Sequence, residues 1–135
     1  MSLFVDTSVW SLLLRRDAPQ DLPEVRALAR ALESGAERIF TSGLVLQELL
    51  QGFSGAKARG AIVQRFSALP LLVPDRKDHV SAADLRNLCR RKGTQIGTID
   101  ALIAQLCIRH DLALLSTDQD FVGIARYCAL HVWGT

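Results

Sequence analysis

Residues 3–10 read Leu-Phe-Val-Asp-Thr-Ser-Val-Trp, and this stretch decides the predicted fold. Three apolar residues that run directly into polar ones are typical of a buried strand in a parallel sheet. Thr7 and Ser8 suit the start of a helix, because a hydroxyl oxygen accepts a hydrogen bond from the unpaired N–H groups there. Asp6 is therefore predicted at the carboxyl end of a first, central strand. Open α/β sheets bind their ligands at that edge.

Short apolar runs alternate with amphipathic segments along the rest of the chain. Strands are predicted at residues 3–5, 38–42, 71–73, 112–115 and 129–133. Helices are predicted at residues 9–14, 44–51, 56–69, 78–92, 99–110 and 121–127. One more helix is predicted to open with an acidic capping box at Asp21-Leu22-Pro23-Glu24 and to end at Gly35. This alternation predicts an α/β sandwich with a mostly parallel sheet.

The composition suits a single domain over residues 1–135 with a well-supplied core, because 49% of the residues are hydrophobic. A net charge of +2 argues against a polybasic nucleic-acid arm, but it excludes neither RNA nor protein as a partner. No apolar run approaches the ~20 residues of a membrane span, and no signal peptide is expected. Cys89, Cys107 and Cys128 are widely spaced and are interpreted as small core residues in a reducing cytosol.

Asp100 is the most informative acid in the sequence. On a helical wheel, Gln105 and Arg109 share one polar face, and Asp100 lies on the opposite side among apolar residues such as Ile103 and Cys107. A favourable interaction with the helix dipole explains an acid in a first turn. It does not explain why the acid points into the apolar stripe, where a carboxylate is costly unless it is paired or binds a metal.

Other acids follow strands or flank apolar helix faces. Asp118 and Asp120 come just after the strand predicted at 112–115, where helix capping is the alternative interpretation. Glu48 lies at the edge of the apolar stripe of its helix, and alone it would be read as a solvated flank. Asp6 and Asp118 follow parallel strands, so they are predicted at the same edge of the sheet. A crevice of three or four carboxylates without histidine or cysteine points to Mg²⁺ or Mn²⁺.

Basic and histidine side chains lie apart from these acids in the sequence. Arg86 and Arg90 are four residues apart on one predicted helix face, and Lys92 follows. A solvated face and a stripe that contacts phosphates both remain open for these three residues. His79, His110 and His131 are interpreted as surface or structural residues.

Four acidic motifs, in this order, make the chain resemble the PIN-domain ribonucleases, and among them the VapC-type toxins of bacterial toxin–antitoxin pairs. The motifs are Asp6-Thr7-Ser8-Val9-Trp10, Glu48-Leu49-Leu50-Gln51-Gly52, Ile96-Gly97-Thr98-Ile99-Asp100-Ala101-Leu102-Ile103-Ala104 and Ser116-Thr117-Asp118-Gln119-Asp120-Phe121. Ser116 is a small departure, because the family more often has threonine there. The hydroxyl is kept.

The resemblance implies a PIN-like three-layer sandwich with about five strands and an endoribonuclease toxin active on RNA. It also implies a catalytic site of Asp6, Glu48, Asp100 and Asp118 that holds Mg²⁺, with Mn²⁺ as a substitute. The resemblance further implies a homodimer, a VapB-like antitoxin that blocks the site, and a cytoplasmic location.

In the expected mechanism, Asp6, Asp100 and Asp118 hold one or two metal ions, and Glu48 orients or deprotonates the attacking water. Thr7, Ser8 and Ser116 are expected to orient the carboxylates, and Asp120 is a further candidate ligand through water.

Three other functions compete with the ribonuclease interpretation. A haloacid-dehalogenase-type phosphatase needs a second aspartate two positions after the first, where this chain has Ser8. A phosphorelay receiver needs a lysine near its last strands, and the only lysines are Lys57, Lys77 and Lys92. A catalytically silent PIN-like binding module is the remaining alternative. It would tolerate loss of one of the four acids, and none is lost.

Overall fold

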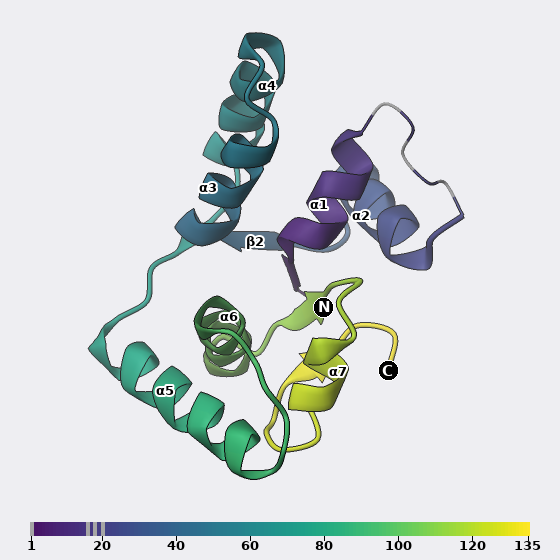
Figure 1. Ribbon diagram of the computed structural model, residues 1–135. Coiled ribbons are helices and arrows are strands. Elements are labelled where there is room, and N and C mark those ends of the chain that lie inside the picture. Colours follow the sequence, from purple (N-terminus) through teal and green to yellow (C-terminus); the bar gives the residue numbers. More distant parts are fainter. Residues whose placement is uncertain (1, 16, 18, 20) are drawn as a thin grey trace.

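A five-stranded parallel sheet forms the middle layer of the protein (Figure 1). In the computed structural model, residues 2–15, 17, 19 and 21–135 are described. The strands are β1 (Leu3–Val5), β2 (Ile39–Ser42), β3 (Leu71–Leu72), β4 (Ala113–Leu115) and β5 (His131–Val132). Their order in the sheet is β3-β2-β1-β4-β5, and every neighbouring pair is parallel. The predicted α/β sandwich and its central first strand are therefore confirmed.

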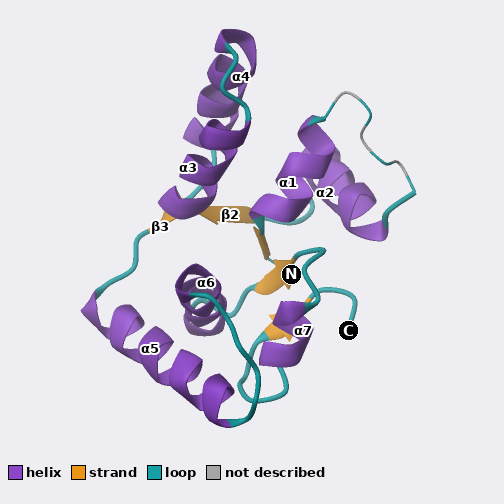
Figure 2. Cartoon of the chain, in the orientation of Figure 1, coloured by secondary structure: helices purple, strands orange, loops and turns teal. Residues whose placement is uncertain are grey.

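Helices cover both faces of the sheet. They are α1 (Thr7–Leu14), α2 (Pro23–Ser34), α3 (Gly43–Gly52), α4 (Ala56–Ser67), α5 (Arg76–Arg91), α6 (Thr98–Arg109) and α7 (Asp120–Ile124). Figures 1 and 2 show α1 to α4 on one side of the sheet and α5 to α7 on the other. The resulting three layers enclose the sheet, which is why β1 and β4 are buried along their whole length.

The core extends from the sheet into the helices on both faces. Phe4 pairs in register with Phe40 of β2 and with Leu114 of β4, and Phe4 is completely buried. Trp10 of α1 is also fully buried, and its ring packs against that of Phe66 in α4, with 5.0 Å between the centroids. Burial of such large side chains supplies several kcal/mol of stabilisation, so this contact anchors α4 to α1.

The helix boundaries differ from the predicted ones by a few residues, mostly at helix starts. α1 begins at Thr7 rather than at residue 9, because the carbonyl of Asp6 already accepts hydrogen bonds from the N–H groups of Val9 and Trp10. The last helix is shorter than predicted and ends at Ile124. These shifts leave every predicted strand and helix in place.

The predicted capping box at Asp21 and Glu24 is wrong. The N-cap of α2 is Leu22, with no side-chain cap bond among the described residues, because Pro23 occupies the first helical position and needs no N–H partner. The predicted stop is confirmed, since Gly35 adopts a φ of 65° and its N–H donates to the carbonyl of Ala31.

A different capping box, which the sequence reading missed, begins α5. The side chain of Asp75 accepts from the N–H of Asp78, and the side chain of Asp78 accepts from the N–H of Asp75, both at 2.9 Å. Arg109 at the end of α6 donates to the same Asp78 oxygen, and its Nη1 lies 3.4 Å from Asp75. These contacts join the first turn of α5 to the last turn of α6.

The remaining cysteine and histidine predictions agree with the structure. Cys89 and Cys107 are buried, Cys128 is half-buried, and all three are free thiols. The three histidines are exposed. Within the part of the chain that is described, no helix combines the length and the apolarity needed to cross a membrane.

Candidate active site

Asp6 lies where the strand order of the sheet reverses. The chain adds β2 and β3 on one side of β1, and then returns to place β4 on the other side. Val5 pairs with Leu115, and the N–H of Asp6 donates to the carbonyl of Leu115 at 2.9 Å. The residues that follow β1 and β4 therefore lie side by side at the carboxyl edge, the position at which open α/β sheets bind ligands.

Two serine hydroxyls hold the Asp6 carboxylate in place. Ser8 and Ser116 donate to its Oδ2 at 2.9 and 2.8 Å, and Asp6 is only 8% exposed. Each serine oxygen also accepts a backbone N–H, from Thr117 to Ser8 at 3.2 Å and from Asp118 to Ser116 at 3.0 Å. The serines thus link the loop after β4 to Asp6. No hydrogen bond to Oδ1 of Asp6 occurs within the described residues, so that oxygen remains open for a ligand.

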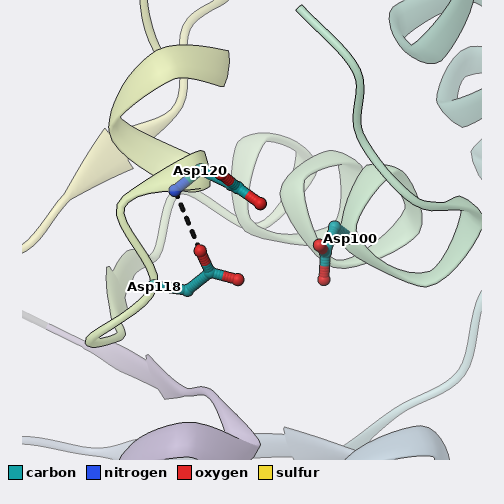
Figure 3. A group of neighbouring side chains, drawn as sticks. All are labelled: Asp100, Asp118 and Asp120. Atoms are coloured by element: carbon teal, nitrogen blue, oxygen red, sulfur yellow. Dashed lines mark hydrogen bonds between the residues drawn. The ribbon is translucent and has the colours of Figure 1, made fainter.

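Three further carboxylates converge from α6, from the loop after β4 and from the start of α7. Asp100, Asp118 and Asp120 each present an oxygen, and these oxygens all lie within 4.8 Å of one another. Figure 3 shows the carboxylates of Asp100 and Asp118 facing the same space, with the N–H of Asp120 donating to Asp118 Oδ1 at 2.9 Å. Like charges at such distances repel, so this arrangement is unfavourable unless a cation or a proton neutralises it.

The neighbouring carboxylates affect the pKa of Asp100. Burial, together with the negative charges of Asp118, Asp6, Asp120 and Glu48, raises the pKa of this half-buried carboxyl from 3.8 to about 6. Asp100 therefore interacts electrostatically with each of the other four acids. The sequence placed Asp100 on the apolar side of its helix, and the structure brings its carboxylate within 4.8 Å of Asp118 and Asp120.

Glu48 approaches the crevice from α3. Its side chain is exposed, and its Oε1 accepts a hydrogen bond from the hydroxyl of Thr7 at 2.9 Å. Because Thr7 directly follows Asp6, this bond fixes Glu48 relative to the first strand.

The model of the PIN domain matches residues 3–127, which is most of the chain. The chain belongs to the PIN-domain family. It is 33% identical over 131 residues to ribonuclease VapC11 of Mycobacterium tuberculosis strain H37Rv, and the match covers 96% of both chains. The structure of VapBC-1 from nontypeable Haemophilus influenzae aligns with a TM-score of 0.74 at 20% identity, covering 98% of this chain and 96% of that one. DNA-bound VapBC from Salmonella typhimurium aligns over the same shares with a TM-score of 0.72 at 23% identity. These two likenesses support the PIN fold.

PIN-domain nucleases generally depend on a divalent metal ion, and this PIN domain offers a suitable donor set. Every candidate ligand is a carboxylate oxygen, which is the ligand type that hard cations such as Mg²⁺ and Mn²⁺ prefer. The group within 4.8 Å consists of Asp100, Asp118 and Asp120, with Asp6 and Glu48 outside it. The structure therefore brings Asp120, which the sequence ranked below the other acids, within 4.8 Å of both Asp100 and Asp118.

Two of the three basic side chains singled out in the sequence, Arg86 and Arg90, have hydrogen-bond partners of their own. Arg86 donates through Nε to the carbonyl of Ile96 at 3.0 Å, and Arg90 donates to the side chain of Asn87 at 3.0 Å. Lys92 is the C-cap of α5. All three side chains are exposed, so their positive charges remain accessible to a ligand.

The serine bridge between Asp6 and the loop after β4 predicts a clear mutational effect. Ser116→Ala removes one donor to Asp6 and the acceptor for the N–H of Asp118. We expect RNA cleavage to fall about 10–100-fold, the usual cost of losing a group that orients a metal ligand. The measurement is kcat/KM on one RNA oligonucleotide, with Ser67→Ala as a control because that hydroxyl bonds only a carbonyl of its own helix. Ser116→Thr is expected to stay within a few fold of the parent, and an unchanged rate for Ser116→Ala would remove the bridge from the catalytic account.

Proposed function

We propose that this PIN domain is a divalent-metal-dependent endoribonuclease that hydrolyses phosphodiester bonds in RNA and acts as the toxin of a toxin–antitoxin pair. The observation that carries the proposal is the group of three carboxylates, Asp100, Asp118 and Asp120, at the sheet's switch point, with Asp6 and Glu48 near enough to act on Asp100 electrostatically. The relative at 33% identity over nearly the whole chain, which bears the name ribonuclease, supports RNA as the substrate class.

The proposed roles follow from where each side chain lies. Asp6, Asp100 and Asp118 would hold Mg²⁺, with Mn²⁺ as a substitute, and Asp120 lies close enough to Asp100 and Asp118 to join them. The ion, when bound, lowers the pKa of a water molecule and offsets negative charge on the phosphate. Glu48 would orient the attacking water or take its proton, and the hydrogen bond from Thr7 would hold the Glu48 carboxylate in position. Ser8 and Ser116 keep Asp6 in a single orientation.

The proposed partners are an RNA substrate, a VapB-like antitoxin and a second copy of the chain. Solved VapBC structures with the same fold support the antitoxin, and the homodimer rests on the resemblance to VapC-type toxins. The proposed location is the cytoplasm, which suits three free thiols. One continuous core cluster, which includes residues from Leu3 to Val132, supports a single domain over residues 1–135.

The metal requirement tests the proposal directly. Protein purified free of any partner is expected to cut single-stranded RNA with Mg²⁺ or Mn²⁺ and to stop in EDTA. Ca²⁺ is expected not to support cleavage, because its looser coordination fails to fix the attacking geometry. Gel analysis of a labelled oligonucleotide measures the products. Asp84→Asn, which removes an exposed acid of α5, is the matched control for charge and is expected to cleave normally.

Three outcomes of this experiment carry information. Cleavage that persists in EDTA would contradict the metal mechanism. Asp100→Asn, included in the same assay, is expected not to cleave, and cleavage that it retains would contradict the proposed role of Asp100. RNA binding without cleavage under every metal condition would favour the binding module over the enzyme.

A further inference from the structure

A cavity of about 310 Å³ opens between α5 and α6, outside the acid crevice. Ala101 and Leu102 supply apolar wall, and Ile99 adds an apolar side chain that is 41% exposed. His79, Arg86 and Thr98 supply polar groups, including one permanent cation. An apolar wall with a few convergent polar groups is the usual make-up of a small-ligand site.

The Arg86 side chain is held in place beside this cavity by a hydrogen bond. Its Nε donates to the carbonyl of Ile96 at 3.0 Å, and Ile96 itself is only 6% exposed. A bond through Nε fixes the guanidinium plane while the two terminal nitrogens stay available, and within the described chain neither has a hydrogen-bond partner. A fixed planar cation beside an apolar wall suits a flat aromatic ligand, because guanidinium planes and apolar side chains both stack on π-faces.

The cavity adjoins the acid crevice across the first turn of α6. Thr98 and Ile99 line the cavity and directly precede Asp100, which faces the other acids. The helix is about 10 Å across, so a ligand that reaches from one side to the other passes over its N-terminus. That end has Gly97 as its N-cap and no side-chain cap bond in the described residues. The unpaired N–H groups at this helix N-terminus favour the binding of a phosphate group of such a ligand.

We propose that this α5–α6 cavity takes one unstacked base of the RNA, from a nucleotide next to the scissile phosphate. The inference rests on the proposed ribonuclease function and adds to it a specificity subsite. The base would lie between Ile99 and the Arg86 plane, with Thr98 and His79 placed to bond its edge. RNA-binding proteins read single strands in this way, by stacking bases and bonding their exposed edges.

The cation favours a nucleotide over a peptide as the occupant. An acidic or phosphate-bearing strand gains from Arg86 and from the helix N-terminus together, whereas an apolar protein segment would have to desolvate the guanidinium without a partner.

The test compares RNA oligonucleotides that lack one base at successive positions around the cleavage site. For the parent protein, an abasic nucleotide at the position that fills the cavity is expected to lower kcat/KM by roughly tenfold to hundredfold, the usual worth of one stacked base. Ala83→Trp places an indole in the cavity from exposed Ala83 of α5. It is expected to cleave normal and abasic RNA at equal rates. Val80→Trp, on the same helix but outside the cavity lining, is the control and is expected to keep the full abasic penalty.

Arg86→Lys provides a second test of the proposal if Ala83→Trp folds poorly. It keeps the charge but loses the Nε bond and the planar face, so the abasic penalty is expected to shrink while cleavage of the abasic RNA persists. A parent protein that cleaves all abasic oligonucleotides as fast as normal RNA would overturn the subsite and leave the ribonuclease intact. A parent protein that cleaves neither normal nor abasic RNA would instead refute the proposed ribonuclease function. If Ala83→Trp changes the sedimentation of the protein and leaves the abasic penalty intact, the cavity is a protein contact and the proposal is wrong.

Discussion

Replacing Asp100 with asparagine is expected to abolish RNA cleavage and to make the metal-free protein more stable at neutral pH. Both effects have one cause, since Asp100 is the carboxylate on which the other four charges act. A pKa raised from 3.8 to about 6 corresponds to about 3 kcal/mol against the ionised folded state. Asp100 is half-buried, so solvent screening reduces the expected gain to about 1–2 kcal/mol. Thermal melts in EDTA measure it.

The pH dependence of the melts gives the same prediction a second readout. Between pH 3.8 and about 6 the folded protein binds a proton at Asp100 that the unfolded chain does not, so stability falls as the pH rises through this window. In EDTA the parent is therefore expected to gain stability from pH 7 to pH 5 through this group. Asp100→Asn has no such proton to bind, so its curve is expected to be flatter over that range.

The control and the opposite outcome separate two interpretations of Asp100. If this carboxylate served only to interact favourably with the helix dipole, its loss would lower the free energy of unfolding by about 0.3–1 kcal/mol instead of raising it. Asp84→Asn, at an exposed site of α5, is expected to change the midpoint little at either pH. A clear drop in the midpoint for Asp100→Asn would show that Asp100 is structural and that the crowded crevice does not govern its energy.

Arg109→Ala is expected to cause a large loss of stability without touching the acid crevice. Asp78 is fully buried, and its Oδ2 accepts from Arg109 and from the N–H of Asp75. Burial raises the pKa of the Asp78 carboxyl, but the N–H of Asp75 and the guanidinium of Arg109 outweigh burial, so the pKa lies below its ordinary value. Without Arg109 the buried charge loses its cation. Breaking a fully buried pair costs about 3–5 kcal/mol, and the partial exposure of Arg109 lowers our expectation to about 2–3 kcal/mol.

Arg15→Ala is the matched control for that experiment. Arg15 and Asp17 also form a salt bridge, at 3.2 Å, but both side chains are largely exposed. We expect little or no change in the midpoint, because solvent screens such surface pairs. Urea titrations of both variants measure the two costs. Equal costs would mean that burial of Asp78 does not strengthen its ion pair. Below its melting temperature Arg109→Ala is expected to retain cleavage.

Local patterns in the sequence were enough to predict the elements and the acids. Burial of Leu3 to Val5 on both faces requires three consecutive apolar residues, and the polar residues that follow mark where the strand ends. The position of Asp100 on the apolar side of α6 follows from helical periodicity alone. Such features depend on residues close together in the chain, which is why the sequence shows them.

Capping was less predictable, because several local patterns compete for a helix start. Asp21 and Glu24 have the spacing of a capping box, yet the helix begins at Pro23. The box that forms pairs Asp75 with Asp78, and the interaction that makes a buried Asp78 tolerable comes from Arg109, 31 residues away. A pairing at that separation leaves no local signal.

The sequence by itself determined that this chain forms a parallel α/β sheet with acids after its strands and at the start of a buried helix. Only the tertiary structure decided which of them meet. The strand order puts β4 beside β1, so Ser116 bonds Asp6 across 110 residues, and Asp120 comes within reach of Asp100. The Arg86 bond to Ile96 and the cavity beside it arise in the same way, from the packing of α5 on α6. The physical reason is that strand order and helix packing depend on the burial of the whole chain, whereas periodicity reports only one element at a time.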